Sequence, residues 1–281
     1  IYAVQFKNNY FLKNTKQTVF PNNKQDKYNV PDPESIRFNT LKNTVVWSSE
    51  GERIVSEKDT VLQNPSIYEM DLQGNFLDSF ILPNNLQMQV SKAGPRQNGV
   101  LEGLSFSTDY SSLYTNVEEP LYEDGEKATV ENNKARIRIF TFDVKTKKNI
   151  AQYFYPLDAI AHPSIPQNAF KVNGVSEILC IDKNKLWVIE RSFSTGVKSC
   201  TIKIFEVILS KKNNILQNKT APILQKKLIF NFDTLNKYID NIEGICIGPT
   251  LSNGNKSVLL ISDDNFNDQQ ITQFYLFSII P

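Results

Sequence analysis

The chain has 281 residues, and its 31 basic and 30 acidic side chains leave a net charge of +1. This balance excludes the strongly basic footprint of proteins that bind nucleic acid or anionic membranes. No apolar run approaches the roughly 20 residues that span a bilayer, while 18 Phe and 11 Tyr supply ample material for a core.

Strand signals begin at the amino terminus. Residues 1–20, IYAVQFKNNYFLKNTKQTVF, resemble the third and fourth strands of a four-stranded unit that lacks its first hairpin. Three full units follow, with strands expected at 34–39, 44–50, 66–72 and 76–82, then 101–107, 111–118, 135–144 and 150–157, then 176–182, 185–191, 201–209 and 224–232. A fourth unit has strands at 242–248, 257–264 and 272–280 and then stops without a fourth strand.

Repeated units of four short strands, rich in β-branched and aromatic residues, are typical of propeller blades. The sequence therefore predicts an all-β protein, a β-propeller of four-stranded antiparallel blades that forms a single domain over residues 1–281. We expect the two terminal segments to meet in one composite or incomplete blade.

Acidic residues recur at the same two places in every unit. Glutamates open the four first strands, at Glu34, Glu102, Glu177 and Glu243. Further acids close the second strands, at Glu50, Glu118, Glu190, Asp263 and Asp264. Because the first two strands of a blade are antiparallel neighbours at the central channel, both sets should converge on one mouth of that channel.

So many carboxylates at one mouth would repel each other unless a positive charge balances them. We predict that Glu34, Glu102, Glu177 and Glu243 bind a metal, most naturally Ca²⁺, which takes oxygen ligands. The predicted substrate-binding residues are the neighbouring arginines and the second-strand acids: Arg53, Arg191, Glu50, Glu118, Glu190, Asp263 and Asp264. The alternative is that the acids only lock neighbouring blades together.

Three cysteines contain no CxxC pair and give neither a zinc site nor a disulfide framework. Cys180 and Cys246 each follow a first-strand glutamate by three residues, which predicts equivalent, unbonded positions in successive blades. A bond between Cys180 and Cys200 within one blade stays open.

Six segments carry a family resemblance: PDPESIRFN, VVWSSEGE, NGVLEGLSFSTDYSSLYTNVEEPLYEDG, VSEILCIDKNKLWVIERSF, IEGICIG and LLISDDNF. They resemble the phytase-like family, described as "esterase-like activity of phytase". The resemblance implies an exported protein, periplasmic or extracellular, with a hydrolase label and about five to six blades in a full-length member. Calcium-dependent propeller phytases, which are similar in architecture, hydrolyse phosphate esters at an acidic channel mouth.

The functional prediction is a phytase-like or esterase-like hydrolase that acts on phosphate or other small-molecule esters, as a monomer, with Ca²⁺ as its cofactor. The catalytic residue is not identified. A serine triad is disfavoured because His162 is the only histidine and no G-x-S-x-G motif occurs. The alternative is a non-enzymatic scaffold that binds a protein or carbohydrate through the long loops 51–66 and 119–134.

Overall fold

The computed structural model describes residues 32–280, which form antiparallel β-sheets and no α-helix. The first sheet contains β1 (Pro33–Asn39), β2 (Thr44–Ser49), β5 (Ser66–Met70) and β6 (Phe76–Ser79). The second contains β7 (Leu101–Phe106), β8 (Ser112–Val117), β9 (Arg136–Asp143) and β10 (Asn149–Pro156). The third contains β11 (Lys171–Asp182), β12 (Lys185–Ser194), β13 (Thr201–Ile208) and β14 (Lys226–Asn231), and the fourth has β15 (Asn241–Ile247), β16 (Ser257–Asp263) and β17 (Phe274–Ser278).

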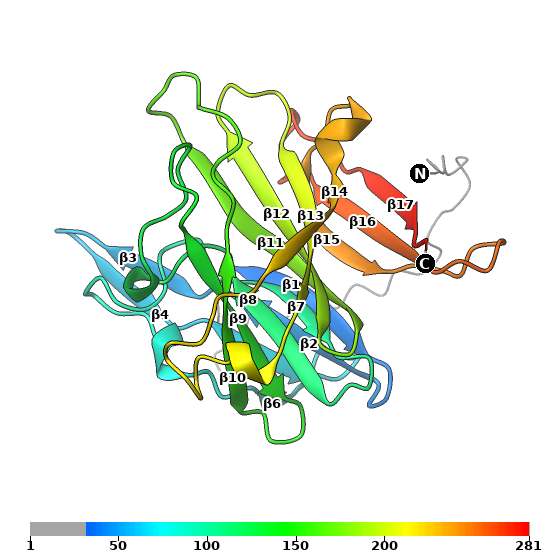
Figure 1. Ribbon diagram of the computed structural model, residues 1–281. Coiled ribbons are helices and arrows are strands. Elements are labelled where there is room, and N and C mark those ends of the chain that lie inside the picture. The colour runs from blue at the N-terminus through cyan, green and yellow to red at the C-terminus, as the bar shows by residue number, and fades with distance from the viewer. Residues whose placement is uncertain (1–31, 281) are drawn as a thin grey trace.

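The four sheets are the blades of a β-propeller, as predicted (Figure 1). The inner strands follow one another around the centre, because β7 contacts both β1 and β11, and β11 contacts β15. The fourth blade has three strands in the described part of the chain, in agreement with the sequence. The strands expected within residues 1–20, and the composite blade they would form, lie outside the described residues.

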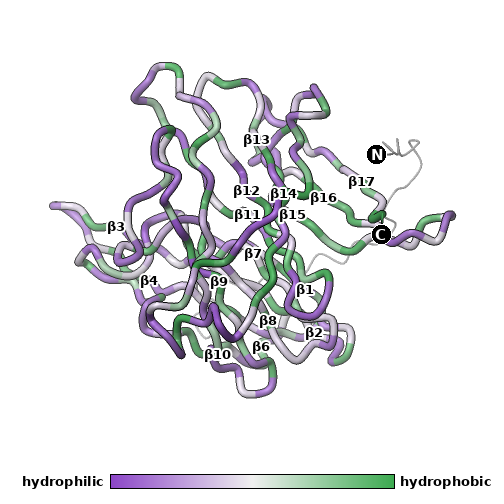
Figure 2. Tube along the Cα trace, viewed as in Figure 1, coloured by the Kyte–Doolittle hydropathy of each residue, from purple (hydrophilic) through white to green (hydrophobic). Residues whose placement is uncertain are grey.

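Alternation along the strands places the core between the blades. In β9, Ile137 and Ile139 are fully buried, while Arg136 and Arg138 are partly exposed; from Ile139 to Phe142 both faces of the strand are buried. Figure 2 shows the resulting pattern, with hydrophobic residues concentrated in the strands and hydrophilic residues in the connecting loops. Both tryptophans of the chain are also buried in apolar clusters.

One pair of strands was not predicted. The loop at 51–66 folds into a two-stranded hairpin of β3 (Glu52–Val55) and β4 (Thr60–Gln63), which extends away from the blades in Figure 1. Gly51 starts the hairpin at φ +75°, and a Cβ there would lie 2.2 Å from the carbonyl oxygen of Gln63. Only glycine fits this close approach.

The connections between the strands contain short 3₁₀ turns. Four 3₁₀ turns occur in the connections: η1 (Asn84–Leu86), η2 (Tyr122–Asp124), η3 (Lys211–Asn213) and η4 (Phe232–Leu235). The η2 turn lies within the second long loop, 119–134. Over residues 32–280 we find no helix with the length and apolar character needed to cross a membrane.

Candidate functional site

A register shift near the start of each inner strand sets which residues reach the channel mouth. The last pairs before the shift are Pro33 with Ser49, Leu101 with Val117, Val175 with Glu190, and Ile242 with Ser262. Because all four blades have the same irregularity, these pairs occupy equivalent positions. The residues that follow them on the two strands are therefore equivalent as well.

The third blade differs from the others at both of these positions. On the first strand the equivalent residues are Glu34, Glu102, Ser176 and Glu243. On the second strand they are Glu50, Glu118, Arg191 and Asp263. Glu177 and Glu190 are thus each one residue away from the positions that the repeat assigned to them. The sequence carries a signal of this: aligned on flanking residues, PESI, LEGL and IEGI match, whereas VSEI has its glutamate one place later.

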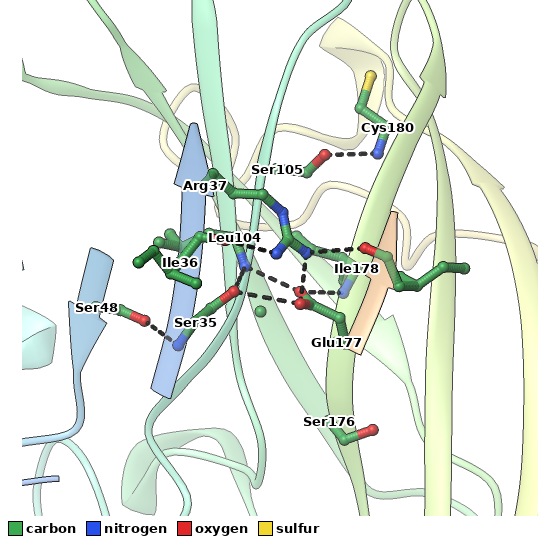
Figure 3. A network of polar contacts seen from close by, with 12 residues as sticks. Ser35, Ile36, Arg37, Ser48, Leu104, Ser105, Ser176, Glu177, Ile178 and Cys180 are labelled. Carbon is green, nitrogen blue, oxygen red and sulfur yellow. Dashed lines mark hydrogen bonds and ion pairs between the residues drawn. The ribbon is translucent and has the colours of Figure 1, made fainter. Parts of the chain in front are cut away.

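Glu177 holds blades together at the centre of the ring (Figure 3). Its carboxylate accepts hydrogen bonds from the Ser35 hydroxyl at 3.2 Å, from the Leu104 amide at 3.1 Å and from the Ile178 amide at 2.9 Å. Arg37 forms an ion pair with it at 2.5 Å and also donates to the carbonyl oxygen of Ile245 at 3.3 Å. These contacts connect all four inner strands, so Glu177 matches the blade-locking alternative.

Glu190 is buried in a second polar network, away from the channel mouth. Its carboxylate accepts from the Tyr155 hydroxyl at 2.7 Å, from the Asp158 amide at 3.0 Å and from the Asn173 side chain at 3.0 Å. Lys226 forms an ion pair with the same carboxylate. Glu190 therefore links β12 to the second blade, and it does not line the cavity described below.

Two of the acids at the channel mouth, Glu50 and Glu118, also contact the next blade. Glu50 is buried and accepts hydrogen bonds from the backbone amides of Gly99, at 3.0 Å, and Val100, at 2.5 Å. Glu118 accepts from the Arg191 guanidinium at 2.6 Å. Both acids therefore stabilise the contact between neighbouring blades, and both also lie at the channel mouth.

The channel mouth opens into a cavity of about 1530 Å³. Its lining includes seven of the predicted acids and arginines, namely Glu34, Glu50, Glu102, Glu118, Arg191, Glu243 and Asp263. A second cavity of about 590 Å³ lies between β1 and the fourth blade. Glu34, Glu102 and Glu243 line both cavities.

Crowding and burial favour the protonated forms of these acids. Removal from water, together with the charges of Glu50 and Asp32, raises the pKa of Glu34 from 4.5 to about 9, although its side chain reaches the cavity. Burial raises the pKa of Glu50 to about 7, against the effect of the backbone hydrogen bonds that it accepts. Burial also raises the pKa of Glu102, with Glu118 and Glu34 adding to the effect.

One group of carboxylates is arranged as cation ligands are. Oxygen atoms of Asp32, Glu34 and Glu50 all lie within 4.8 Å of one another. Three carboxylates form a hard oxygen donor set that suits Ca²⁺. Of the four predicted ligands, only Glu34 belongs to this group. Asp32 was missed, because it precedes the first strand and has no acidic counterpart in the other units.

Arg53 and Asp264 lie outside the cavity lining. The Arg53 guanidinium donates to the carbonyl oxygens of Gln89 at 3.0 Å and Val90 at 3.2 Å, and it stacks on the Tyr122 ring. It therefore fixes the loop beside the β3–β4 hairpin. Asp264 accepts from the Thr272 hydroxyl at 3.0 Å within the β16–β17 connection.

The cysteines show the same register difference as the glutamates. All three are free, so no bond joins Cys180 to Cys200 or to Cys246. The prediction that Cys180 and Cys246 are equivalent is wrong, because Cys180 pairs with Leu186 whereas Cys246 pairs with Leu259, one residue earlier in the repeat. Cys180 is accordingly buried and Cys246 exposed.

Comparison with known proteins agrees with the sequence signals. The family model described as "Phytase-like: Esterase-like activity of phytase" matches residues 1–266. No curated protein matches the chain.

Proposed function

This chain belongs to the phytase-like family, and from that membership and the acidic cavity we propose that it hydrolyses a small-molecule ester, in first place a phosphate monoester. The observation that carries the proposal is the convergence of Asp32, Glu34 and Glu50 within 4.8 Å on a cavity that also contains Arg191. Metal-assisted hydrolysis of a phosphate ester needs an oxygen-ligated cation, a water and a cationic side chain for the phosphate, and these residues supply places for all three.

Asp32, Glu34 and Glu50 would hold the cation. When bound, a divalent ion such as Ca²⁺ polarises the phosphoryl oxygens and makes a nearby water more acidic. Arg191 lines the same cavity, and only one of its terminal nitrogens donates to Glu118. The other terminal nitrogen can therefore donate to a phosphate while the contact with Glu118 is kept.

Glu102 is the carboxyl best placed to move a proton. It is half-buried, lines both cavities and accepts no hydrogen bond from the described residues. It also lies outside the group of three carboxylates that would hold the cation. In the proposed reaction the water oxygen bonds to phosphorus and the bond from phosphorus to the ester oxygen breaks. Glu102, whose raised pKa favours the protonated form, donates its proton to the leaving ester oxygen and then takes up the proton released by the attacking water.

A second candidate function is the docking of a protein or carbohydrate on the two long loops, 51–66 and 119–134. The β3–β4 hairpin favours it, since this hairpin extends from the blades and Arg53 holds it against residues 89–91. Export to the periplasm or the extracellular space is proposed from family membership alone.

Turnover of p-nitrophenyl phosphate, with calcium and with chelator, separates the two candidates. We expect turnover that depends on calcium and is lost in Glu34→Gln. Glu57→Gln, which removes an exposed acid on the β3–β4 hairpin, is the matched control and should retain activity. Absence of turnover under all conditions would contradict the hydrolase proposal and leave docking.

A further inference from the structure

The cavity has an aromatic wall as well as an acidic floor. Phe170 is 67% exposed, and its ring lies 6.0 Å from that of Phe193, measured between centroids. Phe266 is fully exposed and adopts a positive φ of 51° in the β16–β17 connection. All three rings line the cavity. A bulky residue at positive φ is uncommon, and such a conformation is a frequent feature of ligand sites.

The charges of the cavity oppose a highly anionic ligand. Its lining has nine acids: Asp32, Glu34, Glu50, Glu102, Glu118, Glu119, Asp240, Glu243 and Asp263. Only three basic residues face them, and two are already engaged, since Arg191 pairs with Glu118 and Lys127 with Glu119. Lys198 is the third. A polyphosphate would bring up to about two negative charges with each phosphate and would need several arginines or lysines to balance them.

The cavity lining has little free hydrogen-bonding capacity for an anion. The Arg191 guanidinium uses one terminal nitrogen for Glu118, and its Nε atom has no partner among the described residues but is covered from solvent. The Oδ1 atom of Asn241 is likewise unpaired and covered, while Nδ2 of this amide donates to Glu243 at 2.6 Å. The remaining terminal nitrogen of Arg191 therefore suits a single phosphate.

Resting on the proposed function, we propose that this cavity selects monoesters with one anionic head and an apolar, ring-bearing body, and rejects polyphosphorylated compounds. The head lies at the acidic floor beside Arg191, and the body packs against Phe170, Phe193 and Phe266. This division between a polar floor and an apolar wall is usual for small-molecule sites.

Binding of non-hydrolysable ligands tests the selectivity without any turnover. We compare phenylphosphonate, methylphosphonate and myo-inositol hexakissulfate by isothermal titration calorimetry in the presence of calcium. Phenylphosphonate should bind about tenfold or more tightly than methylphosphonate, because only its ring removes apolar surface from water. The hexakissulfate should bind weakest.

Two substitutions test whether the aromatic rings of the cavity cause the preference for phenylphosphonate. Phe170→Ala and Phe266→Ala should each reduce the advantage of phenylphosphonate over methylphosphonate several-fold and leave the methylphosphonate affinity unchanged. Phe38→Ala removes an exposed ring of β1 that does not line this cavity, and it should change neither affinity.

The outcomes separate this inference from the hydrolase proposal. Tighter binding of the hexakissulfate, or equal binding of the two phosphonates, would overturn the selectivity even if p-nitrophenyl phosphate is turned over. A preference for the ring that depends on Phe170 and Phe266 supports the selectivity even if no ester is hydrolysed, and in that case the hydrolase proposal alone fails.

Discussion

Arg191 of the third blade donates to Glu118 of the second blade over 2.6 Å. Arg191 occupies the second-strand position at which the other three blades have Glu50, Glu118 and Asp263. The positive charge that the crowded mouth requires is therefore built into the repeat itself. It stabilises the boundary between two blades and also points a guanidinium into the cavity.

Removal of the positive charge of Arg191 should lower the free energy of unfolding. Arg191→Met leaves Glu118 buried without its partner, and loss of one member of a buried ion pair costs about 3–5 kcal/mol. We expect a clear decrease in the denaturant midpoint, with partial recovery in Arg191→Lys. Lys185→Met is the control, because its pair with Glu206 is more exposed and spans 3.7 Å; it should change stability by less than about 1 kcal/mol. Equal effects of the two methionine variants would contradict the assigned role of Arg191.

Glu177→Gln should act as a structural lesion and not as the loss of a metal ligand. Glutamine replaces one acceptor oxygen with a donor, so one of the groups that contact Glu177 loses its partner, at a cost of about 1–3 kcal/mol. The melting temperature should fall by a similar amount with calcium and with chelator. A variant whose melting temperature is normal in chelator but no longer rises with calcium would place Glu177 in the metal site instead.

Calcium should stabilise the parent protein through Asp32, Glu34 and Glu50. An ion that binds only the folded state adds about 2.7 kcal/mol at a hundredfold excess over Kd. Scanning calorimetry should show this increase, and Glu34→Gln should lose most of it while its metal-free melting temperature stays the same or rises, because repulsion is relieved. Glu57→Gln again serves as the control. A parent melting temperature that does not change with millimolar calcium would contradict the proposed metal site.

The metal-free protein should lose stability as the pH rises. The folded-state pKa values of Glu34, about 9, and Glu50, about 7, lie above the ordinary value of 4.5, so the folded state binds more protons than the unfolded state between these limits. The free energy of unfolding then falls with pH in this window. Melting in chelator should decrease between pH 5 and pH 8, less steeply in Glu34→Gln. Unchanged or rising melting temperatures over this range would contradict the raised pKa values.

The three thiols should differ in reactivity. Cys246 is exposed, whereas Cys180 and Cys200 are buried, and burial raises the pKa of both buried thiols to about 11. One thiol per chain should react rapidly with a disulfide reagent, and the other two should react only after unfolding. A non-reducing mass that is lower by two hydrogens would indicate a disulfide and contradict this assignment.

The local pattern of apolar residues and turns in the sequence was sufficient to locate most of the blade strands. Alternation of apolar residues and turn signals located twelve of the fifteen blade strands within two residues at both ends, because each strand buries one or both faces between blades. The β3–β4 hairpin was missed, since its short strands are only partly buried and carry a weak alternation. The early start of β11, at Lys171, was missed as well.

The sequence by itself determined the fold class, the repeat, and the gathering of acids at one channel mouth, since strand periodicity and antiparallel pairing fix which ends lie together. Only the tertiary structure decided which acids face the cavity. A shift of one residue turns a side chain to the opposite face of a strand, so Glu177 and Glu190 became buried blade contacts while Arg191 reached the mouth. The closeness of Asp32 to Glu34 and Glu50 also depends on how the chain enters the first blade, which no repeat pattern encodes.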